Sequence, residues 1–395
     1  MKIAFLTAGG LAPCLSASIG ALIKEYHAKE PDADLIGYIN GYRGLLLGNS
    51  ISFPDNAHEY ADTLMQYGGS PIGNSRVKLT NVESCVKNGY VKKGENPVAV
   101  AAERLQSDGV DILHTIGGDD TNTMASELAN YLLDNGHYLT VVGLPKTVDN
   151  DVYPIARSLG ADTAAEQGAV FFENIANENT TSTRQLLIHE VMGRHCGWLT
   201  AATAQKYRDR LNKKTFINSM LITKERWNID AVYIPEEELD FDAECERLNK
   251  RMDEKDGVNI FLSEGAGVKA IVKEMEANGE KVPKDDFGHV RLDEINPGQW
   301  FAEQFKMKLN AEKVLVQKSG YFARSAAPNA YDIDLIMRSA SFASDCALEG
   351  KSGVAGLDED NQNEMGLIDF NRIKGGKPFD TNKNWYQQLR QDIKQ

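Results

Sequence analysis

Cysteine and long apolar runs are scarce in this chain of 395 residues. The five cysteines are Cys14, Cys85, Cys196, Cys245 and Cys346. None belongs to a Cys-x-x-Cys pair, so neither a zinc site nor a disulfide framework is indicated, and a reducing cytoplasm is the expected location. No segment reaches the roughly 20 apolar residues of a membrane helix. The first residues, Met-Lys-Ile-Ala-Phe-Leu-Thr, lack the long apolar run and cleavage site of a signal peptide.

Positive charge is also in short supply. Lysine and arginine total 43 against 57 acidic residues, which leaves a formal net charge of −14. This balance disfavours nonspecific binding to nucleic acid or to anionic membranes. A phosphate ligand would therefore need basic residues that are gathered locally. At about 150 residues per domain, the length suggests two or three domains.

Short apolar runs alternate with helical patterns along most of the chain. Strands are predicted at residues 2–8, 35–39, 110–116, 138–144, 185–191, 259–263 and 313–318. Helices are predicted at residues 13–26, 97–107, 159–177, 241–255, 300–310 and 331–349. This rhythm predicts parallel, doubly wound sheets with helices on both faces. Loops are expected at residues 207–235, 269–291 and 320–325, and from residue 350 onward.

Two of the predicted strands end at loops rich in glycine and carboxylates. Residues 117–121 read Gly-Gly-Asp-Asp-Thr, and residues 146–151 read Lys-Thr-Val-Asp-Asn-Asp. Loops at the carboxyl ends of parallel strands face one crevice. Magnesium binds one or two carboxylates together with substrate phosphates, and phosphoryl transfer needs a base, a metal and positive charge. The alternatives are helix capping by the aspartates and an Asx-rich turn.

Two further loops could bind phosphate. Gly9 and Gly10 stand between a predicted strand and a predicted helix, where free backbone amides can hold an anion. The loop at residues 68–76 is rich in glycine and hydroxyl groups and ends in Arg76, which is followed by Lys78. This loop supplies local positive charge. The alternative is a surface turn whose basic side chains are simply solvated.

Four motifs in order resemble the phosphofructokinase family. They are residues 117–121, 145–151 (Pro-Lys-Thr-Val-Asp-Asn-Asp), 192–194 (Met-Gly-Arg) and 263–265 (Ser-Glu-Gly). The resemblance extends from Lys2 to about Glu349. It implies an α/β fold of two Rossmann-like, three-layer lobes with mainly parallel sheets. The expected larger lobe, for pyrophosphate and Mg²⁺, comprises residues 1–155 and about 325–370; the smaller, for the sugar phosphate, comprises residues 156–324 and part of the C-terminal tail.

Two positions within the motifs predict the phosphoryl donor. ATP-dependent members of the family typically have glycine where this chain has Asp120 and Lys146, whereas pyrophosphate-dependent members have aspartate and lysine. A carboxylate at Asp120 would repel the α-phosphate of ATP, and Lys146 can hold the smaller donor. The resemblance thus implies reversible transfer from pyrophosphate to the 1-hydroxyl of fructose 6-phosphate. The alternatives are an ATP-dependent enzyme, sedoheptulose 7-phosphate as acceptor, and a silent regulatory subunit that binds sugar phosphate.

The resemblance also implies residue roles. Asp149 is the expected base and Asp119 the expected magnesium ligand, while Lys146 and Asp120 complete the catalytic set. The expected donor contacts are Gly10, Arg76 and Lys146. The expected sugar-phosphate contacts are Thr147, Asp149, Asp151, Met192, Gly193, Arg194, Glu264, Tyr321 and Arg324. For Tyr321 the alternative is an ordinary core aromatic.

The sequence departs from the family pattern at two places. Residues 9–14 read Gly-Gly-Leu-Ala-Pro-Cys where Gly-Gly-Asp-Ala-Pro-Gly is common, which predicts a narrower donor pocket. The arginine that reaches across from a neighbouring subunit falls at Gln185. Arg184 and Lys318 are the candidates to replace it, and a homodimer or homotetramer is expected.

Overall fold

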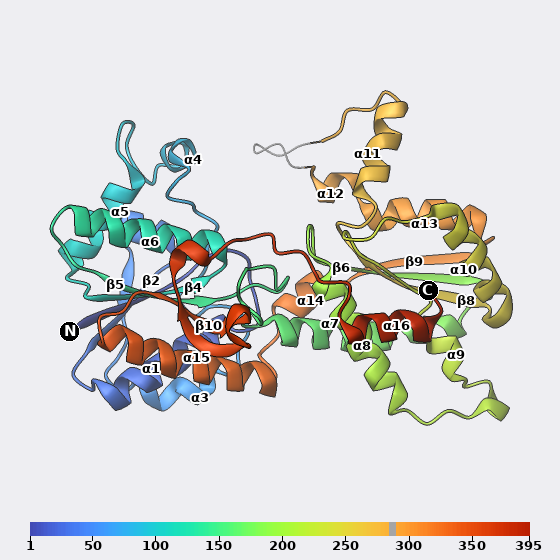
Figure 1. The fold of residues 1–395 in the computed structure, drawn as a ribbon, viewed down its shortest axis with the longest axis horizontal. Helices are drawn as coiled ribbons and strands as arrows, with labels where there is room; N and C mark the ends of the chain where they lie inside the picture. The colour runs from blue at the N-terminus through green and yellow to red at the C-terminus, as the bar shows by residue number, and fades with distance from the viewer. Residues whose placement is uncertain (284–289) are drawn as a thin grey trace. The chain divides into compact units, whose positions relative to one another are not determined.

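The computed structural model describes residues 1–283 and 290–395, apart from the side chain of residue 293. The chain divides into two compact units, each with its own sheet and helices (Figure 1). Unit 1 comprises Met1–Thr163 and Arg324–Lys377, and unit 2 comprises Ala164–Ala323 and Pro378–Gln395. The predicted α/β class with mainly parallel sheets is confirmed.

Unit 1 is built on a seven-stranded sheet of order β11-β10-β5-β4-β1-β2-β3. Its strands are β1 (Lys2–Thr7), β2 (Asp34–Tyr38), β3 (Ser50–Ser52), β4 (Ile112–Gly117), β5 (Thr140–Pro145), β10 (Gly353–Asp358) and β11 (Glu364–Ile368). The inner pairs are parallel, and β2–β3 and β10–β11 are antiparallel. Every residue of β4 and β5 is buried. Burial on both faces explains why these strands are nearly continuous apolar runs.

Helices cover both faces of this sheet. They are α1 (Leu15–Lys29), α2 (Tyr42–Leu47), α3 (Ala61–Leu64), α4 (Val82–Lys87), α5 (Pro97–Asp108), α6 (Asp119–Asp134) and α15 (Ala330–Leu348). Figure 1 shows α5 and α6 on one face and α1 and α15 on the other. On the first face, Leu6, Leu113, Met124 and Leu128 belong to one buried cluster. This packing fixes the start of α6 against the end of β4.

Unit 2 has a four-stranded, wholly parallel sheet of order β7-β8-β6-β9. Its strands are β6 (Gln185–Val191), β7 (Ala231–Tyr233), β8 (Gly257–Ser263) and β9 (Lys313–Lys318). The remaining helices are α7 (Ala161–Ile175), α8 (Trp198–Asn212), α9 (Lys224–Trp227), α10 (Phe241–Lys255), α11 (Val268–Ala277), α12 (Leu292–Ile295), α13 (Pro297–Lys308), α14 (Gly320–Arg324) and α16 (Asn384–Ile393). Short 3₁₀ turns occur at Ala57–Tyr60, Ala176–Thr180, Asn218–Met220, Glu359–Asn361 and Phe370–Arg372.

The prediction of loops was wrong for much of the C-terminal tail. Residues beyond Gly350 form β10, β11 and α16. Val354 and Ile368 are fully buried, so these strands complete the sheet of unit 1. The segment at residues 320–325, also expected to be a loop, contains the short helix α14.

The region between residues 207 and 235 is also more regular than expected. Helix α8 continues to Asn212 because Tyr207 and Leu211 are buried, and Arg208 is buried with them and pairs with Asp392. Within the expected loop at residues 269–291, α11 runs to Ala277, and residues 284–289 lie outside the described residues. Across the described ranges, no helix combines the length and apolarity needed to cross a membrane.

Candidate active site

The loops that follow β1, β4 and β5 lie side by side at one edge of the unit 1 sheet. Thr7 is in register with Ile116, and Gly117 with Pro145, so the three strands end together. The amide of Lys146 donates to the carbonyl of Gly117 over 2.8 Å. The glycine loop and both carboxylate loops therefore meet where an open parallel sheet binds ligands.

Lys146 is buried beneath the first glycine loop. Lys146 is only 2% exposed, and its Nζ donates a hydrogen bond to the carbonyl of Gly10. A Cβ built on Gly9, where φ is +89°, would lie 3.2 Å from Nζ. Burial lowers the pKa of Lys146 from 10.5 to about 8; the charge of Arg76 acts in the same direction, and Cys14 opposes it. The ammonium group is thus poorly solvated, which strengthens its attraction for an anion.

The loop at residues 70–76 packs against the same glycines. The amide of Gly9 donates to the carbonyl of Ser75 over 2.9 Å, and Asn74 Nδ2 donates to the carbonyl of Gly9 over 2.6 Å. A Cβ on Gly10 would lie 3.6 Å from Nη2 of Arg76. The structure therefore brings together Gly10, Arg76 and Lys146, the three expected donor contacts.

Asp119 and Asp120 form the first turn of α6 behind the cap residue Gly118. Asp120 Oδ2 pairs with Lys78 Nζ at 2.5 Å, although the Asp120 side chain is 57% exposed. The sequence indicated Lys78 only as a source of local positive charge. The spacing of Lys78 and Asp120 in the sequence does not predict that they form a pair. The pair holds the Asp120 carboxylate toward the basic loop.

Asn122 is a residue of this site that sequence reasoning missed. It is fully buried, and its Nδ2 donates to the carbonyls of Gly117 and Gly118 over 3.2 and 2.9 Å. Its Oδ1 accepts a hydrogen bond from Thr115 at 3.0 Å. The amide thus ties α6 to the end of β4 and fixes the glycine pair. A lone asparagine one turn into a helix gives no such signal in the sequence.

The loop after β5 folds on its own side chains. Thr147 Oγ1 accepts a hydrogen bond from the amide of Asp149 at 3.1 Å and donates to Asp151 Oδ1 at 3.2 Å. Asn150 has a φ of +54°, and its Oδ1 accepts a hydrogen bond from the amide of Ser158 at 2.8 Å. The turn expected from the Asx-rich sequence is therefore held by the Thr147 hydroxyl and by Asn150. Within this turn Asp149 is close enough to Lys146 for their charges to interact.

Carboxylates from the two loops interact. Burial raises the pKa of Asp151, and the negative charge of Asp119 raises it further. Among the described residues no cluster of three or more histidine, cysteine, aspartate or glutamate side chains could hold a metal. Two carboxylates nevertheless fit Mg²⁺, which takes its remaining ligands from water and substrate phosphates.

In unit 2 the loops after β6 and β8 lie against each other. The amide of Gly193, where φ is +132°, donates to Glu264 Oε1 over 3.3 Å, and Ser263 Oγ donates to the carbonyl of Gly193 over 2.6 Å. A Cβ on Gly265 would overlap the carbonyl oxygen of Arg194. The structure therefore brings together residues 192–194 and Glu264. Burial raises the pKa of Glu264, and the positive charge of Arg194 opposes the rise.

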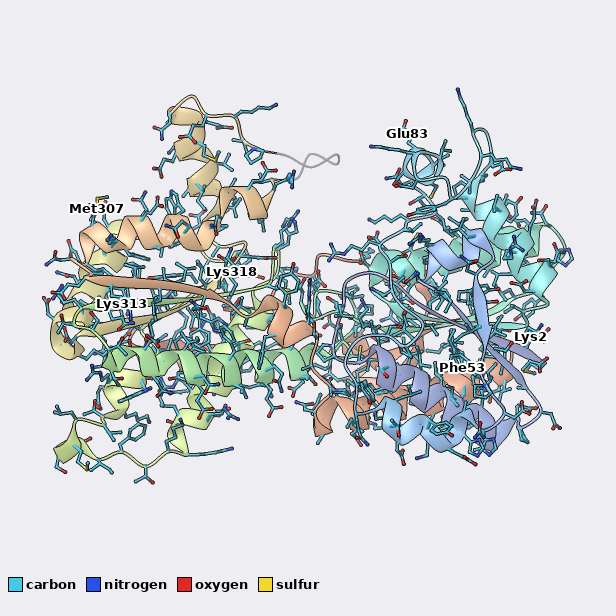
Figure 2. The ribbon with its side chains drawn as sticks, turned by 180° about the vertical axis from the view of Figure 1, so that it is seen from behind. Lys2, Phe53, Glu83, Met307, Lys313 and Lys318 are labelled. Carbon is cyan, nitrogen blue, oxygen red and sulfur yellow. The ribbon has the colours of Figure 1, made fainter. Side chains whose placement is uncertain are left out.

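The two candidates for a residue acting across subunits are engaged within unit 2. Lys318, at one end of β9 in Figure 2, pairs with the buried Glu190 at 2.8 Å. Arg184 Nη1 pairs with Asp253 at 2.6 Å, and its Nε donates to the carbonyl of Asn310 over 2.8 Å. These contacts direct both side chains to their own chain.

Tyr321 and Arg324 stand at opposite ends of the short helix α14. Tyr321 is 80% exposed, so the interpretation of this side chain as a core aromatic is wrong. Arg324 is the first residue of the second stretch of unit 1.

Fold and loops together define a class: an α/β protein with glycine- and carboxylate-rich loops at the carboxyl ends of parallel strands. The sequence model of the family described as phosphofructokinase matches residues 2–347, and the chain belongs to that family. It is 56% identical over 394 residues to the pyrophosphate–fructose 6-phosphate 1-phosphotransferase of Methylomonas methanica, covering 100% of this chain and 96% of the relative. The relative of the same name from Propionibacterium freudenreichii is 54% identical, with 98% and 96% covered.

A solved structure shows the same fold. The pyrophosphate-dependent phosphofructokinase from Nitrosospira multiformis aligns with a TM-score of 0.74, covering 99% of this chain and 90% of that chain. The two sequences are only 17% identical, so the likeness concerns the fold alone.

We expect the substitution Lys146→Met to raise stability at neutral pH. The folded-state pKa of about 8 lies below the ordinary 10.5, so below pH 8 the fold must keep a buried ammonium group charged. The Met variant avoids this cost, which is about 3 kcal/mol. Its advantage should shrink as the pH rises through 8 toward 10.5, where wild-type Lys146 is neutral in the fold.

Urea unfolding at pH 7 and pH 10 measures this effect. The matched control is Lys92→Met, since the side chain of Lys92 is 90% exposed and its replacement should change stability little at either pH. An advantage of Lys146→Met that is absent at pH 7, or that grows toward pH 10, would contradict the explanation.

Proposed function

We propose that this chain transfers a phosphoryl group from pyrophosphate to the 1-hydroxyl of fructose 6-phosphate. The products are fructose 1,6-bisphosphate and orthophosphate, and the reaction serves glycolysis and gluconeogenesis. Relatives more than half identical over nearly the whole chain carry that activity in their names. The pyrophosphate bond and the sugar ester are not far apart in free energy, so the reaction runs usefully in both directions.

The observation that carries the donor assignment is the pair Asp120 and Lys146. Asp120 follows the glycine pair at the end of β4, and Lys146 lies buried under the carbonyl of Gly10. The Asp120 carboxylate, held by Lys78, repels the additional phosphate of a nucleotide. Lys146 and Arg76 supply positive charge for the smaller pyrophosphate beside exposed backbone.

Asp149 is the proposed general base that takes the proton from the sugar hydroxyl. Its backbone is fixed by Thr147, and Lys146 is close enough to interact with its charge. Asp119 is the proposed ligand of Mg²⁺, with Asp151 nearby. When bound, the metal would neutralise charge on the phosphates; Thr147 and Asp151 would orient the reacting groups.

The proposed sugar-phosphate contacts are residues 192–194, Glu264, Tyr321 and Arg324. Glu264 would accept hydrogen bonds from sugar hydroxyls, while the forked guanidinium groups of Arg194 and Arg324 suit phosphate oxygens. The homo-oligomeric state and the cytoplasmic location stay predictions from the sequence.

A donor comparison tests the proposed function directly. With Mg²⁺ and fructose 6-phosphate, we expect turnover with pyrophosphate and a rate with ATP lower by several orders of magnitude. The measurement is the release of orthophosphate or ADP coupled to formation of fructose 1,6-bisphosphate. Turnover with ATP alone would overturn the donor assignment, and no turnover with either donor would favour a silent regulatory subunit.

Asp149→Asn removes the base while conserving shape. The backbone amide of residue 149 still donates to Thr147, so we expect the fold to survive. Because the base is lost, kcat should fall roughly 10²–10⁴-fold. The KM for pyrophosphate should change much less. Asp134→Asn, at the exposed end of α6, is the matched control and should keep wild-type kinetics. A near-normal kcat for Asp149→Asn would refute the assignment.

Asp120→Gly tests the exclusion of ATP. Removal of a carboxylate near the nucleotide phosphates should strengthen ATP binding roughly tenfold, equivalent to about 1.4 kcal/mol. Calorimetric titration with Mg-ATP measures this affinity even if Lys146 keeps the turnover low. Lys78→Met is the paired variant: it leaves the Asp120 carboxylate without its counter-charge and should not improve ATP binding. Unchanged ATP affinity in Asp120→Gly would show that another feature closes the pocket.

A further inference from the structure

A short segment beyond the residues that match the family reaches the proposed metal loop. The match ends at residue 347, whereas β10 and β11 complete the unit 1 sheet after it. The chain then passes through the 3₁₀ turn Phe370–Arg372 to residues 374–377, Lys-Gly-Gly-Lys, which we call the tail segment. Pro378 already belongs to unit 2, so the tail segment is the last part of unit 1.

The tail segment is hydrogen-bonded along the loop that carries Asp151. Tyr153 and Lys374 exchange two backbone hydrogen bonds of 2.8 and 3.0 Å, and the amide of Lys377 donates to the carbonyl of Asp151 over 2.8 Å. Lys377 Nζ donates to the carbonyl of Ile155 over 2.6 Å and pairs with Glu359 at 3.1 Å. These bonds fix the tail segment in place beside residues 151–155.

Gly375 touches the carboxylate of Asp119. A Cβ built there would overlap Oδ2 of Asp119 and lie 3.2 Å from Oδ1. Gly375 is not in the left-handed backbone region, so the backbone conformation does not demand glycine. Its neighbour Gly376 shows the reverse, with a φ of +73° and no atom within 4 Å of an added Cβ. What excludes a side chain at Gly375 is therefore the nearness of Asp119.

We propose that the tail segment is a positioning element for the magnesium-binding carboxylate. In this role the backbone of Gly375 sets where the Asp119 carboxylate lies, and the bond from Lys377 to Asp151 holds the segment to the neighbouring loop. The inference rests on the proposed function, because it takes Asp119 as the metal ligand. It adds a determinant of metal–pyrophosphate affinity that lies outside the family's matched residues.

Charge supports the same arrangement. The positive charge of Lys377 lies beside residues 151–155, where Nζ donates to the carbonyl of Ile155 and pairs with Glu359. The tail segment therefore brings a positive charge to the loop that carries Asp151, and its backbone at Gly375 limits the space of the Asp119 carboxylate. A bulkier residue than glycine would push the Asp119 carboxylate from its place.

Gly375→Ala tests this inference with Gly366→Ala as the matched control. Gly366 lies on β11, also in the C-terminal part of unit 1, has no positive φ and has nothing within 4 Å of an added Cβ. Calorimetric titration of Mg²⁺ into protein with inorganic pyrophosphate measures binding without turnover. We expect Gly375→Ala to weaken Mg²⁺ binding at least about tenfold and Gly366→Ala to leave it within twofold. The melting temperature of Gly375→Ala should stay near the wild-type value.

Fructose 6-phosphate binding is the readout that separates positioning from general damage, and it should be unchanged in Gly375→Ala. If that variant fails to fold, Lys377→Gln decides, since it leaves Gly375 in place and weakens the bonds to Ile155 and Glu359 that anchor the tail segment; a clear weakening of Mg²⁺ binding is expected. Wild-type Mg²⁺ affinity in a folded Gly375→Ala, or in Lys377→Gln if Gly375→Ala does not fold, would overturn the inference. Absence of pyrophosphate turnover in the wild type would instead overturn the proposed function.

Discussion

The site depends on the parallel pairing of β4 with β5. Their register sets Gly117 opposite Pro145, and the bond from the amide of Lys146 to the carbonyl of Gly117 carries the pairing into the loops. A shift of one residue would turn the side chains of one strand to the opposite face. Because both strands are buried on both faces, the fit of side chains into a close-packed interior specifies the register. Two carboxylate loops distant in the sequence are thereby held at one edge.

Close approach of backbone is the second constraint. Lys146 reaches the carbonyl of Gly10 beneath a loop in which Gly9 leaves room for its ammonium group. At Gly375 the absence of a side chain likewise lets the tail segment, distant in the sequence, contact the Asp119 carboxylate. At both positions glycine allows a charged side chain to approach the backbone closely, and the backbone in turn limits where that side chain can lie. A site for a small, highly charged donor needs such tight placement, since its affinity comes from few groups.

Local charge overrides the acidic balance of the chain. Arg76, Lys78, Lys146 and Lys377 all gather near the acidic loops of unit 1 although the net charge is −14. Lys78 and Lys377 offset carboxylates, whereas Lys146 is buried and weakly solvated. The proposed function requires both kinds of charge at this edge, because a metal needs negative ligands and a phosphate needs positive ones.

The sequence by itself determined the α/β class, most of the strands, and the loops at residues 117–121 and 146–151. These signals are local, because buried parallel strands are apolar runs and their loops gather glycine and carboxylates. Only the tertiary structure decided the contacts of Asn122, Lys78 and Gly375, and the strands β10 and β11. Each depends on a partner distant in the sequence or on the backbone of a neighbouring residue. The residue type alone does not predict such contacts. The polar tail is predicted to be a loop from its sequence because its strands become buried only when β10 pairs with β5.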